Sequence, residues 1–125
     1  MALGTENLKL YGLRGATTAK QNTPEAIESA VSELIEILID KNDLDPNQIV
    51  SITFSVTKDL NACSPAAIAR RQMGWENVAL LDCQQMQVPG DLSYCIRILA
   101  HVWLPKGQDP QHPYLREASS LRPDR

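Results

Sequence analysis

Three arginines occupy positions where a fixed positive charge could bind an anion. Arg14 ends a predicted strand, Arg70 lies in a short predicted helix, and Arg97 lies inside CIRILAHVWL, residues 95–104. Both alternating faces of that segment are largely apolar, as in a strand that is covered on both sides. A guanidinium keeps its charge, and leaving it buried without a partner costs several kcal/mol. Arg97 therefore needs an anion, either from the chain itself or from a ligand.

Other kinds of catalytic chemistry find little support in the sequence. Asp82 closes a predicted strand and, taken alone, is best explained as a loop cap. His101 and His112 have no partners at metal-ligand spacing, and the glycines of GLRGATT lack the lysine spacing of a phosphate-binding loop. The hydroxyl of Ser64 has no evident catalytic histidine and is better explained as a helix cap. The residues alone therefore indicate an anion site built on arginines, without covalent catalysis.

Length and charge narrow the class of protein. The 125 residues fit one domain, residues 1–125, and 12 basic against 15 acidic side chains give a net charge of −3. This balance gives no general attraction to nucleic acid or to anionic membranes. No apolar run approaches the roughly 20 residues of a membrane span, and the N-terminus does not read as a signal peptide. The three cysteines lack metal-type spacing and are interpreted as reduced thiols of a cytoplasmic protein.

Predicted strands and helices alternate along the chain. Thr23 and Pro24 predict a helix start, and apolar residues then recur every three or four positions as far as Leu38. Ser64 and Pro65 predict a second, shorter helix that stops at Gly74. This order predicts an α/β or α+β sheet with helices on one face. The predicted strands cover residues 8–14, 51–56, 77–82 and 95–104, and residues 15–22 and 83–93 are predicted loops.

Four motifs in this order resemble the monofunctional chorismate mutases of the AroH class. They are GLRGATT, SPAAIARRQMGW, DCQQMQVPGDLSYCIRIL and YLREASSLRPD, and the resemblance runs from about Tyr11 to Asp124. It implies a mixed sheet with helices on one side and a homotrimer that looks like a pseudo-α/β barrel, with active sites in clefts between neighbouring subunits. It also implies the Claisen rearrangement of chorismate to prephenate, in phenylalanine and tyrosine biosynthesis. This unimolecular step needs no nucleophile, metal or cofactor.

The resemblance also implies roles for individual residues. Arg97, in CIRIL, is expected to face the ether oxygen of the substrate, where negative charge grows as the bond breaks, and a carboxylate. Arg14 and Tyr114 are expected to bind the side-chain carboxylate, and Arg70 is expected to come from the neighbouring subunit, near the mouth of the cleft. The other expected contacts are a wall against the ring (Leu81, Asp82, Cys83, Gln84 and Gln85) and a closing segment (Leu121 and Arg122).

The chain departs from the family pattern at four positions within these motifs. Asp82 stands where the pattern has a cysteine, and Gln85 replaces a glutamate that accepts a hydrogen bond from the ring hydroxyl of the substrate. We therefore expect Asp82 to accept that bond and to balance the charge of Arg97, with Gln85 at most auxiliary. Ser64 and Ala67 replace an aromatic residue and a lysine at the cleft mouth, so weaker substrate capture is expected.

Three other functions remain open on the sequence. Small trimers with interfacial arginines include imine deaminases of the Rid type, although LRGATT and SLRPD are not motifs of that family. A catalytically silent binding protein for chorismate-like or prephenate-like anions is compatible with the exchange at Asp82 and Gln85. In a purely structural role, Arg97 would form an internal salt bridge with Asp82.

Overall fold

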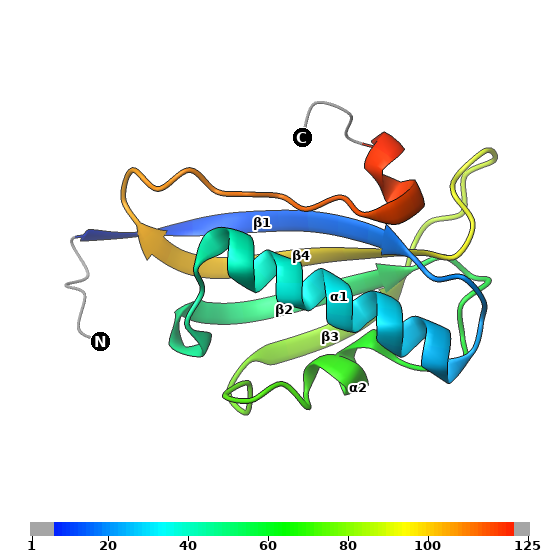
Figure 1. Ribbon diagram of the computed structural model, residues 1–125, viewed down its shortest axis with the longest axis horizontal. Coiled ribbons are helices and arrows are strands. Elements are labelled where there is room, and N and C mark those ends of the chain that lie inside the picture. Colours follow the sequence, from blue (N-terminus) through cyan, green and yellow to red (C-terminus); the bar gives the residue numbers. More distant parts are fainter. Residues whose placement is uncertain (1–6, 122–125) are drawn as a thin grey trace.

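The sheet of this chain has four strands, and two helices cover one of its faces (Figure 1). The computed structural model describes residues 7–121. β4 is antiparallel to both β1 and β2, whereas β2 and β3 are parallel, so the predicted mixed sheet with helices on one face is confirmed. No helix in residues 7–121 is long and apolar enough to cross a membrane. The elements are β1 (Leu8–Thr18), α1 (Pro24–Asn42), the 3-10 helix η2 (Pro46–Gln48), β2 (Ile49–Val56), α2 (Pro65–Ala69), β3 (Ala79–Gln84), β4 (Cys95–Pro105) and the 3-10 helix η3 (Arg116–Leu121), and the strand order is β1-β4-β2-β3.

The long helix α1 begins and ends at the residues that its local sequence predicts. The side chain of Thr23 accepts a hydrogen bond from the backbone N–H of Ala26 at 3.1 Å, and Pro24 occupies the first turn. After Asn42 the chain turns through the left-handed conformation at Asp43, with φ of 50°. The predicted apolar stripe is buried along the whole helix and comprises Ile27, Ala30, Val31, Leu34, Ile35 and Leu38.

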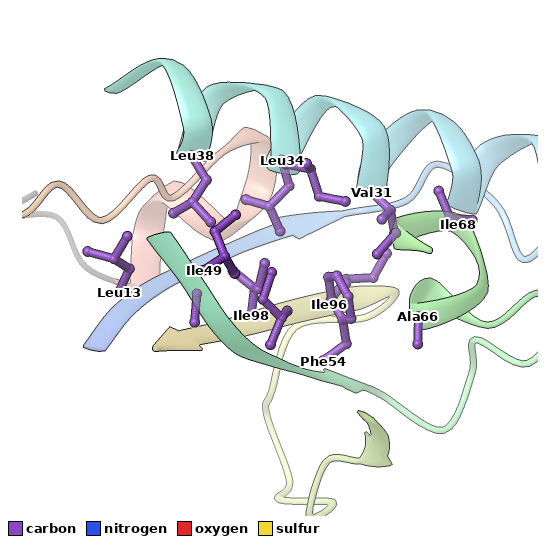
Figure 2. Packing of buried hydrophobic residues seen from close by; sticks show 14 of the residues in the cluster. Leu13, Val31, Leu34, Leu38, Ile49, Phe54, Ala66, Ile68, Ile96 and Ile98 are labelled. Carbon is purple, nitrogen blue, oxygen red and sulfur yellow. The ribbon is translucent and has the colours of Figure 1, made fainter. Parts of the chain in front are cut away.

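The core lies between the helices and the face of the sheet that they cover (Figure 2). Val31, Leu34 and Leu38 of α1 point toward the sheet, where Phe54 and Ile98 are buried. Burying a side chain of this size stabilises the fold by about 1.5–3 kcal/mol. This packing determines which face of each strand is turned away from the helices.

The first strand is longer than the sequence predicts. Residues 15–18, a predicted loop, continue β1 to Thr18 and pair with β4. The C-terminal segment adds pairing at the other edge of β1, with Ala16 donating to the carbonyl of Pro113 at 3.0 Å and accepting from the N–H of Leu115 at 2.8 Å. Gly15 permits this close approach, because a Cβ atom there would lie 2.7 Å from the carbonyl oxygen of Pro113. The extension of β1 was therefore not predictable from local sequence, because it depends on pairing with residues about 100 positions away.

The sheet face that points away from the helices is open in the single chain. Leu10, Leu99 and Trp103 are 47%, 39% and 41% exposed on it, and we call this surface the open face. The expectation that β4 is covered on both sides is therefore wrong for one chain. Two element ends also differ from prediction: α2 stops at Ala69, before the turn that leads to Gly74, and β3 continues to Gln84.

Candidate active site

The strand register arranges the side chains of the open face in rows across the sheet. Cα partners on neighbouring strands direct their side chains to the same face. Arg14 and Arg97 belong to adjacent rows of that face, so the register brings the two predicted arginines together. One row is formed by Ala16, Arg97, Ser55 and Cys83, and the next by Arg14, Leu99, Thr53 and Leu81.

A cavity of about 260 Å³ lies over these rows, and we call it the Arg97 cavity. It brings together Arg14, Arg97 and Tyr114, three of the residues predicted for substrate binding. Thr53 and Ser55 were not predicted as site residues. The alternation of polar and apolar residues in β2 does indicate that both lie on the face away from the core. The complete lining is Arg14, Gly15, Thr53, Ser55, Arg97, Ile98, Leu99 and Tyr114.

Arg97 is half-buried and does not obtain an anion from residues 7–121. Its Nε atom is buried and has no hydrogen-bond partner among those residues. The salt bridges there, Arg71–Glu28 and Arg116–Glu33, do not include it. Burial raises the pKa of the neighbouring Cys95 thiol, with the positive charge of Arg97 opposing this shift, so the thiol stays neutral near pH 7. The described part of the chain thus leaves a buried donor that is suited to an acceptor on a ligand.

The start of β4, two residues before Arg97, is held by a carboxylate that the sequence analysis did not identify. Asp59 accepts a hydrogen bond from the hydroxyl of Thr57 and another from the N–H of Tyr94, the latter at 2.9 Å. The Thr57 hydroxyl in turn accepts from the N–H of Cys95 at 3.0 Å. This clamp fixes Tyr94 in the left-handed conformation with φ of 52° and so sets where β4 begins. No local pattern in the sequence indicates the clamp as a whole, because Tyr94 and Cys95 lie more than 30 residues after Thr57 and Asp59.

The segment before η3 places Tyr114 beside Arg14. The backbone N–H of Arg14 donates to Nδ1 of His112 at 3.0 Å, and Tyr114 forms a bridge with Ala16. The side chain of Arg14 is exposed at the edge of the Arg97 cavity. Its position therefore depends on pairing between the two ends of the chain.

The structure does not bring Asp82 together with Arg97. Asp82 pairs with Phe54, which is fully buried in the core, so its side chain lies on the face that the helices cover. There its carboxylate accepts hydrogen bonds from the hydroxyl of Ser64 and from the N–H of Ala66. The sheet therefore separates Asp82 from Arg97 in this chain. The expectation that Asp82 balances the charge of Arg97 is wrong. The internal salt bridge of the purely structural alternative is wrong for the same reason.

The other residues predicted for the ring wall follow the alternation of β3. Leu81 is 61% exposed on the open face, and Cys83 lies beside Ser55 and donates a hydrogen bond from Sγ to the carbonyl of Phe54 at 3.4 Å. Gln84 is exposed at the end of β3. Gln85 comes next and lines a second cavity of about 230 Å³ together with residues 57–59 and 86–93.

The side-chain amide of Gln85 has a hydrogen-bond partner at its nitrogen but none at its oxygen among the described residues. Its Nε2 donates to a carboxylate oxygen of Asp91 at 3.3 Å, and its backbone N–H donates to Val56 at 2.8 Å. Its Oε1 is buried and has no partner within residues 7–121. Because a carboxylate only accepts hydrogen bonds, the amide nitrogen must face Asp91 and the carbonyl oxygen must point elsewhere. Gln85 thus offers a neutral acceptor.

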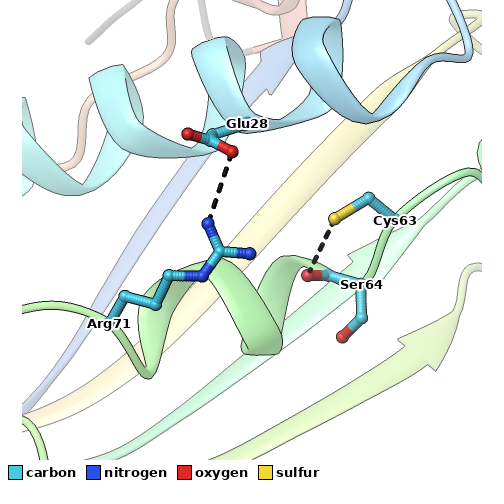
Figure 3. A network of polar contacts seen from close by, with 4 residues as sticks. All are labelled: Glu28, Cys63, Ser64 and Arg71. Carbon is cyan, nitrogen blue, oxygen red and sulfur yellow. Dashed lines mark hydrogen bonds and ion pairs between the residues drawn. The ribbon is translucent and has the colours of Figure 1, made fainter.

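Arg70 does not reach the Arg97 cavity within one chain. It is the exposed residue that follows α2, next to Arg71, whose guanidinium is 3.3 Å from Glu28 of α1 (Figure 3). Leu121, half-buried, ends η3, and Arg122 lies outside the described residues. The three cysteines are free, as predicted.

Comparisons with known proteins agree with the resemblance noted in the sequence. The family model for chorismate mutase type I matches residues 10–125. A chorismate mutase AroH from Bacillus subtilis (strain 168) is 37% identical over 118 residues, which are 94% of this chain and 93% of that protein. A chorismate mutase AroH from Thermus thermophilus is 42% identical over 115 residues, 90% of this chain and 93% of that protein.

A solved structure supports the same assignment. The chorismate mutase from Clostridium thermocellum has a TM-score of 0.81 and 40% sequence identity to this chain, covering 89% of this chain and 99% of that one. These matches do not favour a catalytically silent binding protein. The resemblance to AroH-class enzymes is thus confirmed, and the chain belongs to the chorismate mutase type I family of isomerases.

Proposed function

We propose that this chain rearranges chorismate to prephenate in the Arg97 cavity. The observation that carries the proposal is the half-buried Arg97, whose buried Nε has no hydrogen-bond partner within residues 7–121, in a cavity that also holds Arg14 and Tyr114. Chorismate carries two carboxylates and an ether bond that breaks in the reaction. A site with two cations and a hydroxyl matches a substrate of that charge.

The proposed mechanism needs only positioning and electrostatic stabilisation. Arg14 and Tyr114 bind the side-chain carboxylate and hold the enolpyruvyl group over the ring. Arg97 donates to the ether oxygen as negative charge develops there. A preorganised donor of this type contributes about 2.7–4 kcal/mol to transition-state stabilisation. The neutral thiol of Cys95 beside it leaves the positive charge of Arg97 available to the substrate.

Gln85, and not Asp82, is the proposed acceptor for the ring hydroxyl. The buried Oε1 of Gln85 has no partner among residues 7–121, whereas both carboxylate oxygens of Asp82 accept hydrogen bonds from the region of α2. A neutral amide acceptor binds a hydroxyl less strongly than a carboxylate does. The proposed ring wall keeps Leu81, Cys83 and Gln84, and Leu121 with Arg122 is proposed to close the cleft.

A homotrimer is proposed as the working form, located in the cytoplasm. The open face exposes apolar side chains, among them Leu10 and Trp103, which are Cα partners on adjacent strands. A second copy covering this face would bury them, and could bring Arg70 to the mouth of a cavity that lacks it within one chain. The site is therefore proposed to lie between subunits.

The test follows the ultraviolet absorbance of chorismate on addition of the purified protein. Wild type is expected to consume chorismate and release prephenate, and Arg97→Ala is expected to lower kcat by about 100- to 1,000-fold. Arg71→Ala is the matched control, because that arginine pairs with Glu28 away from the cavity, and it should retain wild-type turnover. Binding of prephenate without turnover of chorismate by wild type would contradict the proposal.

A further inference from the structure

The short helix α2 depends on contacts outside itself. It has five residues, Pro65–Ala69, too few to be stable in isolation. Its first N–H groups lack partners within the helix, as at every helix start. The hydroxyl of Ser64, its N-cap, accepts from the N–H of Ala67 at 3.2 Å, and the carboxylate of Asp82 accepts from the N–H of Ala66 at 3.0 Å.

Ser64 and Asp82 cap this helix as one hydrogen-bonded unit. Besides accepting from Ala67, the Ser64 hydroxyl donates to the second carboxylate oxygen of Asp82. Each group therefore holds the other in place while both hold the helix start. Asp82 belongs to β3, so the unit ties α2 to the edge strand of the sheet. Figure 3 shows Ser64 at one end of α2 and Arg71 near the other.

The residue that follows this helix is Arg70, whose backbone N–H donates to the carbonyl of Ala66 at 2.9 Å. Ala66 is thus bound through its N–H to Asp82 and through its carbonyl to Arg70. One residue links the cap to the arginine. A shift of the helix start would therefore move the backbone of Arg70.

We propose that Asp82 is a positioning residue that acts with Ser64 to fix α2 and, through it, Arg70 at the mouth of a neighbouring copy's cavity. The kinetic part of this inference rests on the proposed function, because it needs Arg70 to bind substrate. The part that concerns the capping of α2 by Asp82 and Ser64 does not rest on the proposed function. Both positions also depart from the family pattern noted in the sequence, and a single contact between them accounts for the two changes together.

The kinetic test uses Asp82→Ala and Ser64→Ala, singly and combined. Each single variant is expected to raise KM for chorismate about fivefold, as loss of a helix cap of typical strength allows, with kcat within about twofold of wild type. The double variant should resemble the singles, because the two groups act as one unit. Asp82→Asn keeps an acceptor for the Ala66 N–H and is expected to restore part of the loss. A fall in kcat that matches the loss at Arg97→Ala would overturn the inference, because it would indicate contact with the reacting atoms.

The Arg70→Ala background separates positioning from direct contact with substrate. If Asp82 acts through Arg70, adding Asp82→Ala to Arg70→Ala should leave KM unchanged. A further rise of about fivefold in that background would show that Asp82 acts on the substrate independently of Arg70, and would overturn the inference.

A measurement without substrate tests the cap even if chorismate is not turned over. Amide hydrogen exchange at Ala66 and Ala67 is expected to be faster in Asp82→Ala than in wild type, while exchange in α1 stays unchanged. Equal exchange in the two proteins would refute the cap, whatever the result for the proposed function.

Discussion

At the scale of single residues, Cys95 and Arg97 differ in how their charge responds to burial. Arg97 cannot release its proton, so the cost of burying it is offset only by a nearby acceptor. The Cys95 thiol avoids that cost by remaining neutral. The pair thus presents one positive charge and no compensating negative charge to the cavity.

The pH dependence of stability should report on Cys95. Burial raises the pKa of its thiol above the ordinary value of 9.0, so the folded chain holds the proton more tightly than the unfolded chain. The free energy of unfolding should therefore be undiminished below that value and fall as the pH rises through it and above. Urea unfolding at about pH 7 and about pH 10 should show a smaller loss for Cys95→Ala than for wild type. Equal losses in the two proteins would contradict the prediction.

Gln85 provides a second prediction at this scale. If its Oε1 accepts the ring hydroxyl, Gln85→Ala removes one hydrogen bond to a neutral group, worth about 0.5–1.5 kcal/mol. We expect kcat/KM for chorismate to fall by about 2- to 13-fold, measured by loss of absorbance. Gln21→Ala, at an exposed position in the turn before α1, serves as the control. Wild-type kcat/KM in Gln85→Ala, together with a large loss in Asp82→Asn, would instead return the acceptor role to Asp82.

At the scale of elements, the sequence predicted correctly those helix and strand boundaries that depend on contacts between residues close together in the chain. The start of α1 was predictable because Thr23 and Pro24 act within one turn of the residues that they cap. The end of β1 was not, because Ala16 is paired by Pro113 and Leu115. The motifs identified Arg14 and Arg97 as site residues before their common cavity was known.

The role of Asp82 shows why part of the site could not be read from the sequence. Its face depends on the register with Phe54 in β2, and its partners, Ser64 and Ala66, lie 18 and 16 residues away. A one-residue slip in register would have turned the same carboxylate toward Arg97. Spacing within a motif carries no information on that register.

The clamp at the start of β4 gives a prediction about an element. Asp59→Ala would leave the N–H of Tyr94 and the hydroxyl of Thr57 without their acceptor, which costs about 1–3 kcal/mol for each group that remains buried. Chemical denaturation should show that loss, and kcat should fall because Arg97 is carried by the strand that the clamp anchors. Thr23→Ala, which removes the cap of α1, should destabilise by about 1 kcal/mol with little effect on kcat. Equal kinetic losses in the two variants would mean that the clamp acts only through overall stability.

At the scale of the whole molecule, the open face and the position of Arg70 lead to the same expectation. A single chain exposes apolar residues on the sheet and keeps Arg70 away from the Arg97 cavity. A ring of copies related by rotation would address both if the contact between copies covers the open face and brings Arg70 of one copy to the Arg97 cavity of the next. Sedimentation should then give a mass of about three times the 13.9 kDa of one chain.

Mixing subunits tests whether each site is shared between copies. Arg70→Ala and Arg97→Ala are each expected to have low activity at chorismate concentrations well below KM. When the two variants are unfolded and refolded together, about a quarter of the interfaces in a randomly assembled ring should combine an intact Arg97 with an intact neighbouring Arg70, and activity should recover accordingly. The control is wild type refolded with the double variant: shared sites give about a quarter of the full activity, whereas sites within one chain give about a half. Recovery no greater than the mean of the two single variants would contradict a site shared between copies, because only a site that spans two copies can be restored by a partner that carries the other defect.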